Sequence, residues 1–234
     1  MKKQLAKLAL TATLALAITL TLNACEEKEK KQDSTTPEPA AATETQQPSQ
    51  EAAAPPPTQE AATTTFTDPR NNKAYKTVKI GEQIWMAENL NFEAKSSKCY
   101  DDKPDNCKKY GRLYDWGSAL SACPNGWHLP SADEWQTLVD FAGGYEVAGK
   151  ALKAKSGWNE NGNGIDEFGF SALPSGFGEP DGSFSNVGNI SNWWSAVEVG
   201  SNDASGRGMY HSSEDASTVH SNKSDLFSVR CIKD

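Results

Sequence analysis

Residues 123–135 read C-P-N-G-W-H-L-P-S-A-D-E-W, a stretch that contains a turn, a short strand and the start of a helix. Ser131 and Glu134 have the spacing of a capping box, in which each side chain accepts a hydrogen bond from the other residue's free backbone N–H. We therefore predict a helix that begins after Ser131 and stops at Gly143-Gly144. Its apolar residues recur at helical spacing: Ala132, Trp135, Leu138, Val139 and Ala142.

A hairpin and two further helices are predicted around this helix. Residues 74–80 alternate as a strand, and Gly81-Glu82 is a two-residue turn into a second strand at 83–86. Residues 147–155 have the pattern of a short helix. Asp115 is positioned to cap another short helix, whose apolar residues are Trp116, Ala119, Leu120 and Cys123.

The second half of the chain differs, because Gly, Asn and Ser separate brief apolar pieces. This pattern predicts long loops between short strands at residues 168–173, 184, 193–199, 209–210 and 226–232. In the last strand Phe227, Val229 and Cys231 alternate with polar residues, which predicts one buried face. We expect Arg230 to pair with an acid such as Asp133 or Glu134.

The N-terminal residues predict export. Residues 1–7 carry three lysines, and the apolar run at 8–22 is short for a membrane span. The run ends Leu-Asn-Ala-Cys, which resembles the lipobox of bacterial lipoproteins. We predict a signal peptide at 1–24 and lipid attachment at Cys25, with an ordinary secretory signal or an uncleaved anchor as the alternatives. Two acyl chains give stable anchoring, and the expected location is the bacterial outer membrane, at its periplasmic face or at the cell surface.

Residues 25–65 consist mainly of Pro, Ala, Thr, Gln and Glu, with no large apolar residue to offset the entropy of ordering them. We predict a disordered tether there and one folded domain at 66–234. The whole chain has a formal net charge of -8. A domain of that sign lacks the basic face that binds a phosphate backbone, so no nucleic-acid partner is expected.

Four cysteines lie in the predicted domain: Cys99, Cys107, Cys123 and Cys231. In an exported protein they are expected to be oxidised. Four cysteines allow three pairings, of which we favour Cys99 with Cys107, in a segment at 89–114 that we expect to be irregular, and Cys123 with Cys231. A zinc site is the competing interpretation, but the sequence has no Cys-x-x-Cys pair or histidine at ligand spacing.

Several long motifs occur in the order of a known family. They are residues 67–92, 110–114, 123–135, 162–174, 193–195 and 227–231. From about Thr67 to its end the chain resembles the Fibrobacter succinogenes major paralogous domain, and parts of it resemble the C-type lectin-like fold, including its formylglycine-generating-enzyme branch. The resemblance implies an extracytoplasmic, disulfide-braced α+β domain of C-type lectin-like type, with short helices, twisted antiparallel strands and long loops. No agreed biochemical activity comes with it.

One segment has part of the pattern of a calcium loop, in which oxygen ligands alternate and a glycine allows the turn. The position at which such loops have a bidentate glutamate is occupied by Phe170. Asn and Gly also favour turns because they tolerate left-handed backbone angles. Calcium is therefore a candidate cofactor, and a simple turn is the alternative, for Asn159, Asn161, Asn163, Asp166 and Glu167.

The sequence contains seven tryptophans, and Trp193-Trp194 is the first candidate platform for a sugar ring. Adjacent residues on a strand point to opposite faces, so at most one of the two is expected in the core. His128 is expected to be a packed side chain, and no Gly-x-Ser-x-Gly elbow accompanies the histidines.

These observations favour a non-enzymatic binding module for carbohydrate or a surface protein, because long loops commonly carry recognition. An enzyme of formylglycine type is the second hypothesis, but it requires active cysteines. An architectural component of the envelope is the third.

Overall fold

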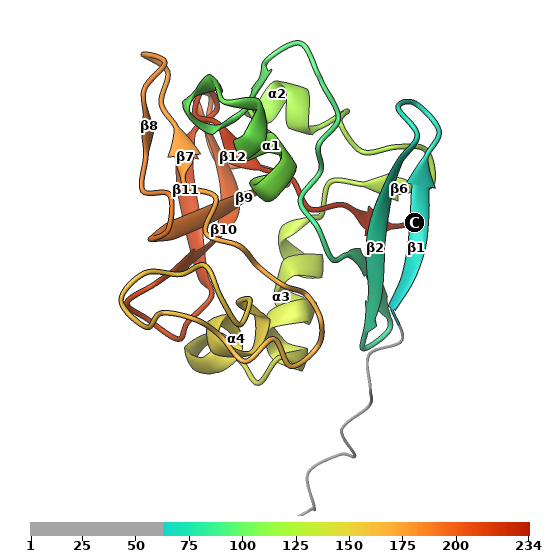
Figure 1. Ribbon diagram of the computed structural model, residues 1–234, viewed down its shortest axis with the longest axis vertical. Coiled ribbons are helices and arrows are strands. Elements are labelled where there is room, and N and C mark those ends of the chain that lie inside the picture. Colours follow the sequence, from blue (N-terminus) through green and yellow to red (C-terminus); the bar gives the residue numbers. More distant parts are fainter. Residues whose placement is uncertain (1–62) are drawn as a thin grey trace, which may run out of the picture. The chain divides into compact units, whose positions relative to one another are not determined.

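The computed structural model describes residues 63–234 (Figure 1). The predicted signal peptide, Cys25 and the tether as far as residue 62 lie outside the described residues. The first strand, β1, spans Thr63–Asp68, and all six residues pair with β2. The last three residues of the segment predicted as tether, 63–65, therefore belong to the fold, because a neighbouring strand supplies the pairing that their own side chains do not indicate.

The predicted hairpin is confirmed, and it lies in a five-stranded sheet. Strand β2 spans Lys73–Ile80 and β3 spans Gln83–Met86, with Gly81 at φ +59° in the turn. The strand order is β1-β2-β3-β13-β6, in which β6 is Trp127–His128 and β13 is Ile232–Lys233. The first and last strands of the described chain thus belong to one sheet, on the right in Figure 1.

A six-stranded sheet has the order β11-β10-β9-β12-β5-β4, and all of its pairs are antiparallel except β12 with β9. A separate two-stranded sheet joins β7 and β8. The strands of the two sheets are β4 (Ser97–Lys98), β5 (Leu113–Tyr114), β7 (Phe177–Gly178), β8 (Phe184–Ser185), β9 (Ile190–Glu198), β10 (Asp203–Tyr210), β11 (Ser217–Asn222) and β12 (Phe227–Ser228). The segment 168–173, predicted as a strand, forms only an isolated bridge between Ala172 and Lys153.

The predicted central helix is α3, Ala132–Phe141, and both hydrogen bonds of the Ser131–Glu134 capping box are present. Asp115 caps α2, Trp116–Ala119, by accepting from the Ser118 N–H. Helix α4, Tyr145–Leu152, begins two residues before the predicted helix and ends three residues earlier. The segment 89–114 is less irregular than expected, because it contains a 3-10 turn at Tyr100–Asp102 and helix α1 at Pro104–Tyr110.

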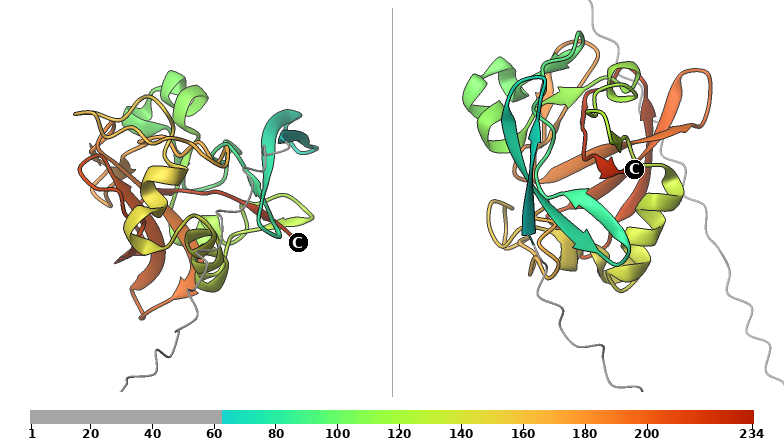
Figure 2. Two further views of the ribbon diagram at one scale, coloured as in Figure 1. Left: turned by 90° about the horizontal axis from the view of Figure 1, so that it is seen from below. Right: turned by 90° about the vertical axis from the view of Figure 1, so that its right-hand side faces the viewer.

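Residues 227–232 lie in the interior rather than along one face of a sheet. Their first part, β12, pairs in the six-stranded sheet, and their last part, β13, enters the five-stranded sheet. The connecting residues run between the two sheets, as the red segment leading to the C-terminus shows (Figures 1 and 2). All six residues are buried, including Ser228 and Arg230. The prediction of a single buried face is wrong here, because packing on both sides encloses the segment.

Both tryptophans of β9 are fully buried. Trp193 packs in one apolar cluster with Trp135 and Phe170, and Trp194 packs in a second cluster, where it stacks on Phe227 with ring centroids 4.2 Å apart. Adjacent residues do point to opposite faces, but both faces of β9 are covered. The prediction that Trp193 or Trp194 offers an exposed sugar platform is therefore wrong.

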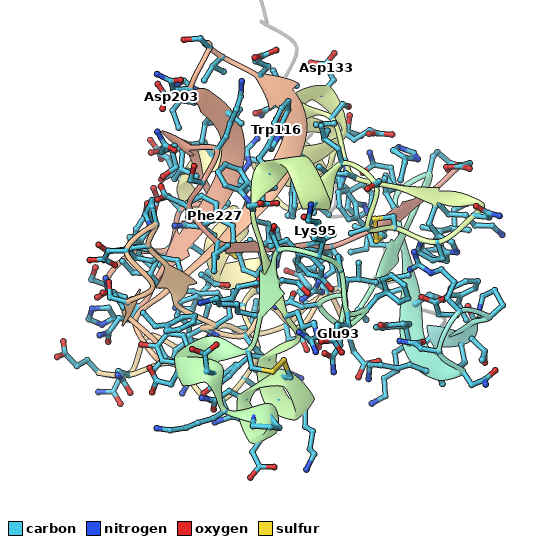
Figure 3. The ribbon with its side chains drawn as sticks, turned by 90° about the horizontal axis from the view of Figure 1, so that it is seen from above. Glu93, Lys95, Trp116, Asp133, Asp203 and Phe227 are labelled. Atoms are coloured by element: carbon cyan, nitrogen blue, oxygen red, sulfur yellow. A yellow bond between two sulfur atoms is a disulfide. The ribbon has the colours of Figure 1, made fainter. Side chains whose placement is uncertain are left out.

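Two disulfides, drawn as yellow bonds in Figure 3, brace the domain. Their pairing is the favoured one. Cys99–Cys107 closes a short segment around α1, across a sequence separation of 8 residues. Cys123–Cys231 joins the turn after α2 to the interior segment, across 108 residues. The described chain is thus an α+β fold with short helices and mostly antiparallel sheets. Within residues 63–234 no helix has the length and apolar character needed to cross a membrane.

Candidate functional site

A cavity of about 350 Å³ lies between the five-stranded sheet, α1 and the loop at 169–173. We call it the α1 cavity. Strand β2 contributes Lys73 and Lys76, and the chain after β3 contributes residues 87–89 and 91. The remaining lining comes from Thr63, residues 107–111, Gly169, Ser171, Leu173 and Arg230. This volume is within the lower part of the range found for small-molecule sites.

The Asn89 side chain organises the floor of the cavity. Its Oδ1 accepts hydrogen bonds from Trp193 Nε1 at 2.8 Å and from Arg230 Nη2 at 2.8 Å and Nε at 3.0 Å. Its Nδ2 donates to the Tyr110 carbonyl at 2.9 Å and to Ser228 Oγ at 3.2 Å. One amide therefore joins β9, the end of α1 and the interior segment.

Arg230 is 1% exposed. The predicted ion pair with Asp133 or Glu134 is wrong, because the hydrogen bonds of Arg230 go to other residues. Its Nη1 donates to the carbonyl oxygens of Met86 and Phe170, and its other bonds go to Asn89. Burial lowers the pKa of Arg230 to about 9, against the opposing effect of Glu88 and Asp166, so the group stays charged at neutral pH. The expected ion pair does not form because Arg230 lies in the interior, while Asp133 is at the exposed start of α3.

Helix α1 forms one wall of the cavity. The Cys99–Cys107 disulfide ties this helix to the preceding segment, and Gly111 ends it at φ +78°. A Cβ on Gly111 would be 2.7 Å from Asn89 Cβ and 2.9 Å from the Leu90 carbonyl. Only glycine allows the helix end to lie this close to the floor.

Two of the candidate calcium ligands, Asn163 and Asp166, have side-chain oxygens that accept hydrogen bonds from other residues of the loop. Asn163 Oδ1 accepts from the Trp158 N–H, and the two Asp166 oxygens accept from the backbone N–H and Oγ of Ser171. Asn161 and Asp166 have positive φ, as expected for turns. In the described part of the chain, no group of three or more His, Cys, Asp or Glu side chains could hold a metal ion. The contacts of Asn163 and Asp166 favour the turn interpretation for this loop, in which Asn159 Nδ2 donates to Asn189 Oδ1 at 3.0 Å.

His128 is hydrogen-bonded through both ring nitrogens. Nε2 lies 2.8 Å from Glu134 Oε1, and Nδ1 lies 2.7 Å from Asp234 Oδ1. Partial burial alone would lower the pKa of His128, but these carboxylates raise it above its ordinary value. Burial likewise opposes the net change at Glu134, whose pKa is lowered by hydrogen bonds from Ser131 and His128. The histidine thus has satisfied nitrogens, although its side chain is 40% exposed.

This geometry predicts a pH-dependent stability contribution. The raised pKa of His128 stabilises the fold below about pH 6.5 and loses this effect as the pH rises through the folded-state value. The lowered pKa of Glu134 stabilises the fold above about pH 4.5 and loses its effect at lower pH. The melting temperature of His128→Gln should therefore fall furthest below that of the unaltered chain between about pH 4.5 and 6.5.

The control for this measurement is His220→Gln, because His220 is exposed on β11 and has no ion pair within residues 63–234. We expect the His220→Gln melting curve to follow the unaltered chain at every pH. A constant difference between His128→Gln and the unaltered chain from pH 4 to pH 8 would contradict the role of the ion pairs.

The residues of the α1 cavity were not identified from sequence. Asn89 and Arg230 are separated by 141 positions, and Lys108 and Lys109 belong to a helix that was not predicted. The one local signal is the Lys103-Pro104 step, because proline favours the first turn of a helix.

Comparison with known proteins supports the resemblance noted above. No curated protein and no solved structure is similar enough to this chain to give a match. Residues 78–233, which contain β3, all four helices and both disulfides, match the model of the Fibrobacter succinogenes major domain. The chain belongs to the Fibrobacter succinogenes major domain family.

Proposed function

We propose that this protein is a lipid-anchored extracytoplasmic recognition module that binds carbohydrate in the α1 cavity. The observation that carries this proposal is a cavity of about 350 Å³ whose lining combines polar and apolar surface over a hydrogen-bonded floor. The side chains of Asn91 and Lys76 line the cavity and make no hydrogen bond with other residues of the 63–234 segment. Such groups are available to the hydroxyls of a bound sugar.

We infer that the fold is C-type lectin-like, which would place the module in a class that often acts in recognition. The pairing of β13 with β3, the long disulfide and the loop-rich second half support this inference. All four cysteines of the described chain are in disulfides, which supports binding over formylglycine-type catalysis, because a disulfide sulfur is not a free nucleophile.

The lipobox-like sequence ending at Cys25 supports attachment to the bacterial outer membrane, at its periplasmic face or at the cell surface. A lipid anchor and a long Pro- and Thr-rich tether would hold the module away from the lipid surface and give it reach. Mass spectrometry of the purified protein would identify acylation at Cys25, and an unmodified Cys25 would exclude this mode of anchoring.

A glycan array and a polysaccharide pull-down with the full chain in detergent would test carbohydrate binding. We expect Asn91→Trp to abolish binding, because an indole would fill the cavity while no side-chain hydrogen bond of Asn91 is lost. Asn202→Trp is the matched control, since Asn202 is exposed in the β9–β10 turn and does not line the cavity. Negative results across both assays, or equal binding by the two variants, would contradict the proposal.

A further inference from the structure

The lining of the α1 cavity has a charge opposite to that of the protein. Its charged residues are Lys73, Lys76, Lys108, Lys109 and Arg230, against the single acid Glu88. The whole chain has a net charge of -8. Positive charge is therefore concentrated at this cavity on an otherwise acidic protein, and a cleft lined by one sign of charge attracts ligands of the other sign.

Arg230 provides a charge at the floor that no acid of residues 63–234 pairs with directly, although Glu88 and Asp166 lie near enough to raise its pKa against the effect of burial. Its hydrogen bonds all go to uncharged oxygens, those of Asn89, Met86 and Phe170. A guanidinium in water-poor surroundings normally has a carboxylate or a similar anion as its partner. Since Arg230 also lines the cavity, an anion bound there would lie beside a buried positive charge that has no anionic hydrogen-bond partner.

The lysines of the lining make only weak contacts within the protein. Lys73 Nζ lies 5.0 Å from the ring of Tyr75, and Lys109 Nζ lies 4.7 Å from the ring of Tyr110. Lys76 has no ion-pair partner among residues 63–234, and Lys108 makes an exposed pair with Asp105. Exposed contacts of these kinds contribute little to stability, so a bound anion competes with them easily.

The hydrogen bonds of Arg230 also limit the kind of anion. Four of its bonds are made within the protein, and a guanidinium has five N–H groups. Arg230 therefore cannot clamp a phosphate or a carboxylate with two parallel bonds, and it acts on a bound anion through its charge and its one remaining N–H. The lysines act as point charges, and the Asn91 amide and other polar groups remain for neutral hydroxyls.

We propose that the α1 cavity selects an acidic sugar, whose carboxylate is held by the positive charges of Lys73, Lys76 and Arg230 while the lining binds its hydroxyls. This proposal rests on the carbohydrate-binding function above and specifies the class of sugar. The carboxylate remains ionised, and binding involves no covalent step.

Calorimetry or ligand-observed NMR with the full chain in detergent tests this selection. The ligands are sodium glucuronate, glucose and sodium acetate. We expect glucuronate to bind at least about tenfold more tightly than glucose or acetate, because neither of these has both a carboxylate and sugar hydroxyls. The double variant Lys73→Gln/Lys76→Gln should weaken glucuronate binding at least about tenfold. Raising NaCl from about 50 mM to about 500 mM should also weaken it, because salt screens charges near the surface.

Lys79→Gln is the matched control, because Lys79 lies on the same strand as Lys73 and Lys76 but does not line the cavity. This variant should bind glucuronate as the unaltered chain does. Equal binding of glucuronate and glucose, equal binding of glucuronate and acetate, or no effect of the double variant would overturn the selection of an acidic sugar.

The two proposals fail in different ways. If neutral polysaccharides bind and Asn91→Trp prevents this, while glucuronate does not bind, the charge-based selection is wrong and the carbohydrate function stands. If no sugar of either kind binds, both are wrong.

Discussion

Asn89→Leu is expected to lower the free energy of unfolding by about 3–5 kcal/mol. The substitution removes the oxygen that accepts from Trp193 Nε1 and from two nitrogens of Arg230. It also removes the donor to the Tyr110 carbonyl and Ser228 Oγ. Since Arg230 is buried and charged, the loss of this partner leaves a desolvated charge with only backbone carbonyls around it. Urea unfolding of the full chain, followed by tryptophan fluorescence, measures the change.

The control for this substitution is Asn91→Leu, two positions along the same segment. The Asn91 side chain has no hydrogen bond with the rest of residues 63–234, so we expect a loss below about 1 kcal/mol. A double-mutant cycle with Arg230→Met isolates the reason for the effect. The double variant should be more stable than the sum of the single losses implies, because the buried charge has been removed. Additive losses, or equal losses in Asn89→Leu and Asn91→Leu, would contradict this account.

The elements with a local cause could be predicted from the sequence. The capping box at Ser131 and Glu134 fixes the start of α3, and the periodic apolar residues give its buried face. The turn at Gly81 likewise determines the β2–β3 hairpin. In these cases a few neighbouring residues contain the whole physical reason for the structure.

The elements that depend on distant partners could not be predicted in the same way. Strand β11, Ser217–Asn222, has only one large apolar residue and forms because β10 offers its edge. Trp193 and Trp194 alternate as on a half-exposed strand, but both faces of β9 are covered by residues distant in the sequence. Arg230 was expected to pair with an acid. Its actual partner is the amide of Asn89, 141 positions away, and nothing in the sequence near Arg230 indicates it.

The two disulfides should differ greatly in their effect on stability, although each is a single bond. A cross-link stabilises by restricting the unfolded chain, and the effect grows with the length of the loop that it closes. Replacing Cys123 and Cys231 by alanine should cost about 4–5 kcal/mol, because 108 positions separate them. The same replacement at Cys99 and Cys107, separated by 8 positions, should cost no more than about 3 kcal/mol.

The packing around each bridge strengthens this difference. Cys231 is fully buried in the segment between the two sheets, where its carbonyl accepts from the Met86 N–H, so loosening it disturbs both sheets. Cys107 lies in the wall of the α1 cavity, so the short bridge should matter more for ligand binding than for stability. Unfolding by urea and binding of glucuronate should be measured for both double variants. Equal losses of stability would show that loop length does not determine the contribution of these bridges, and unchanged binding in Cys99→Ala/Cys107→Ala would show that the wall keeps its shape without its bridge.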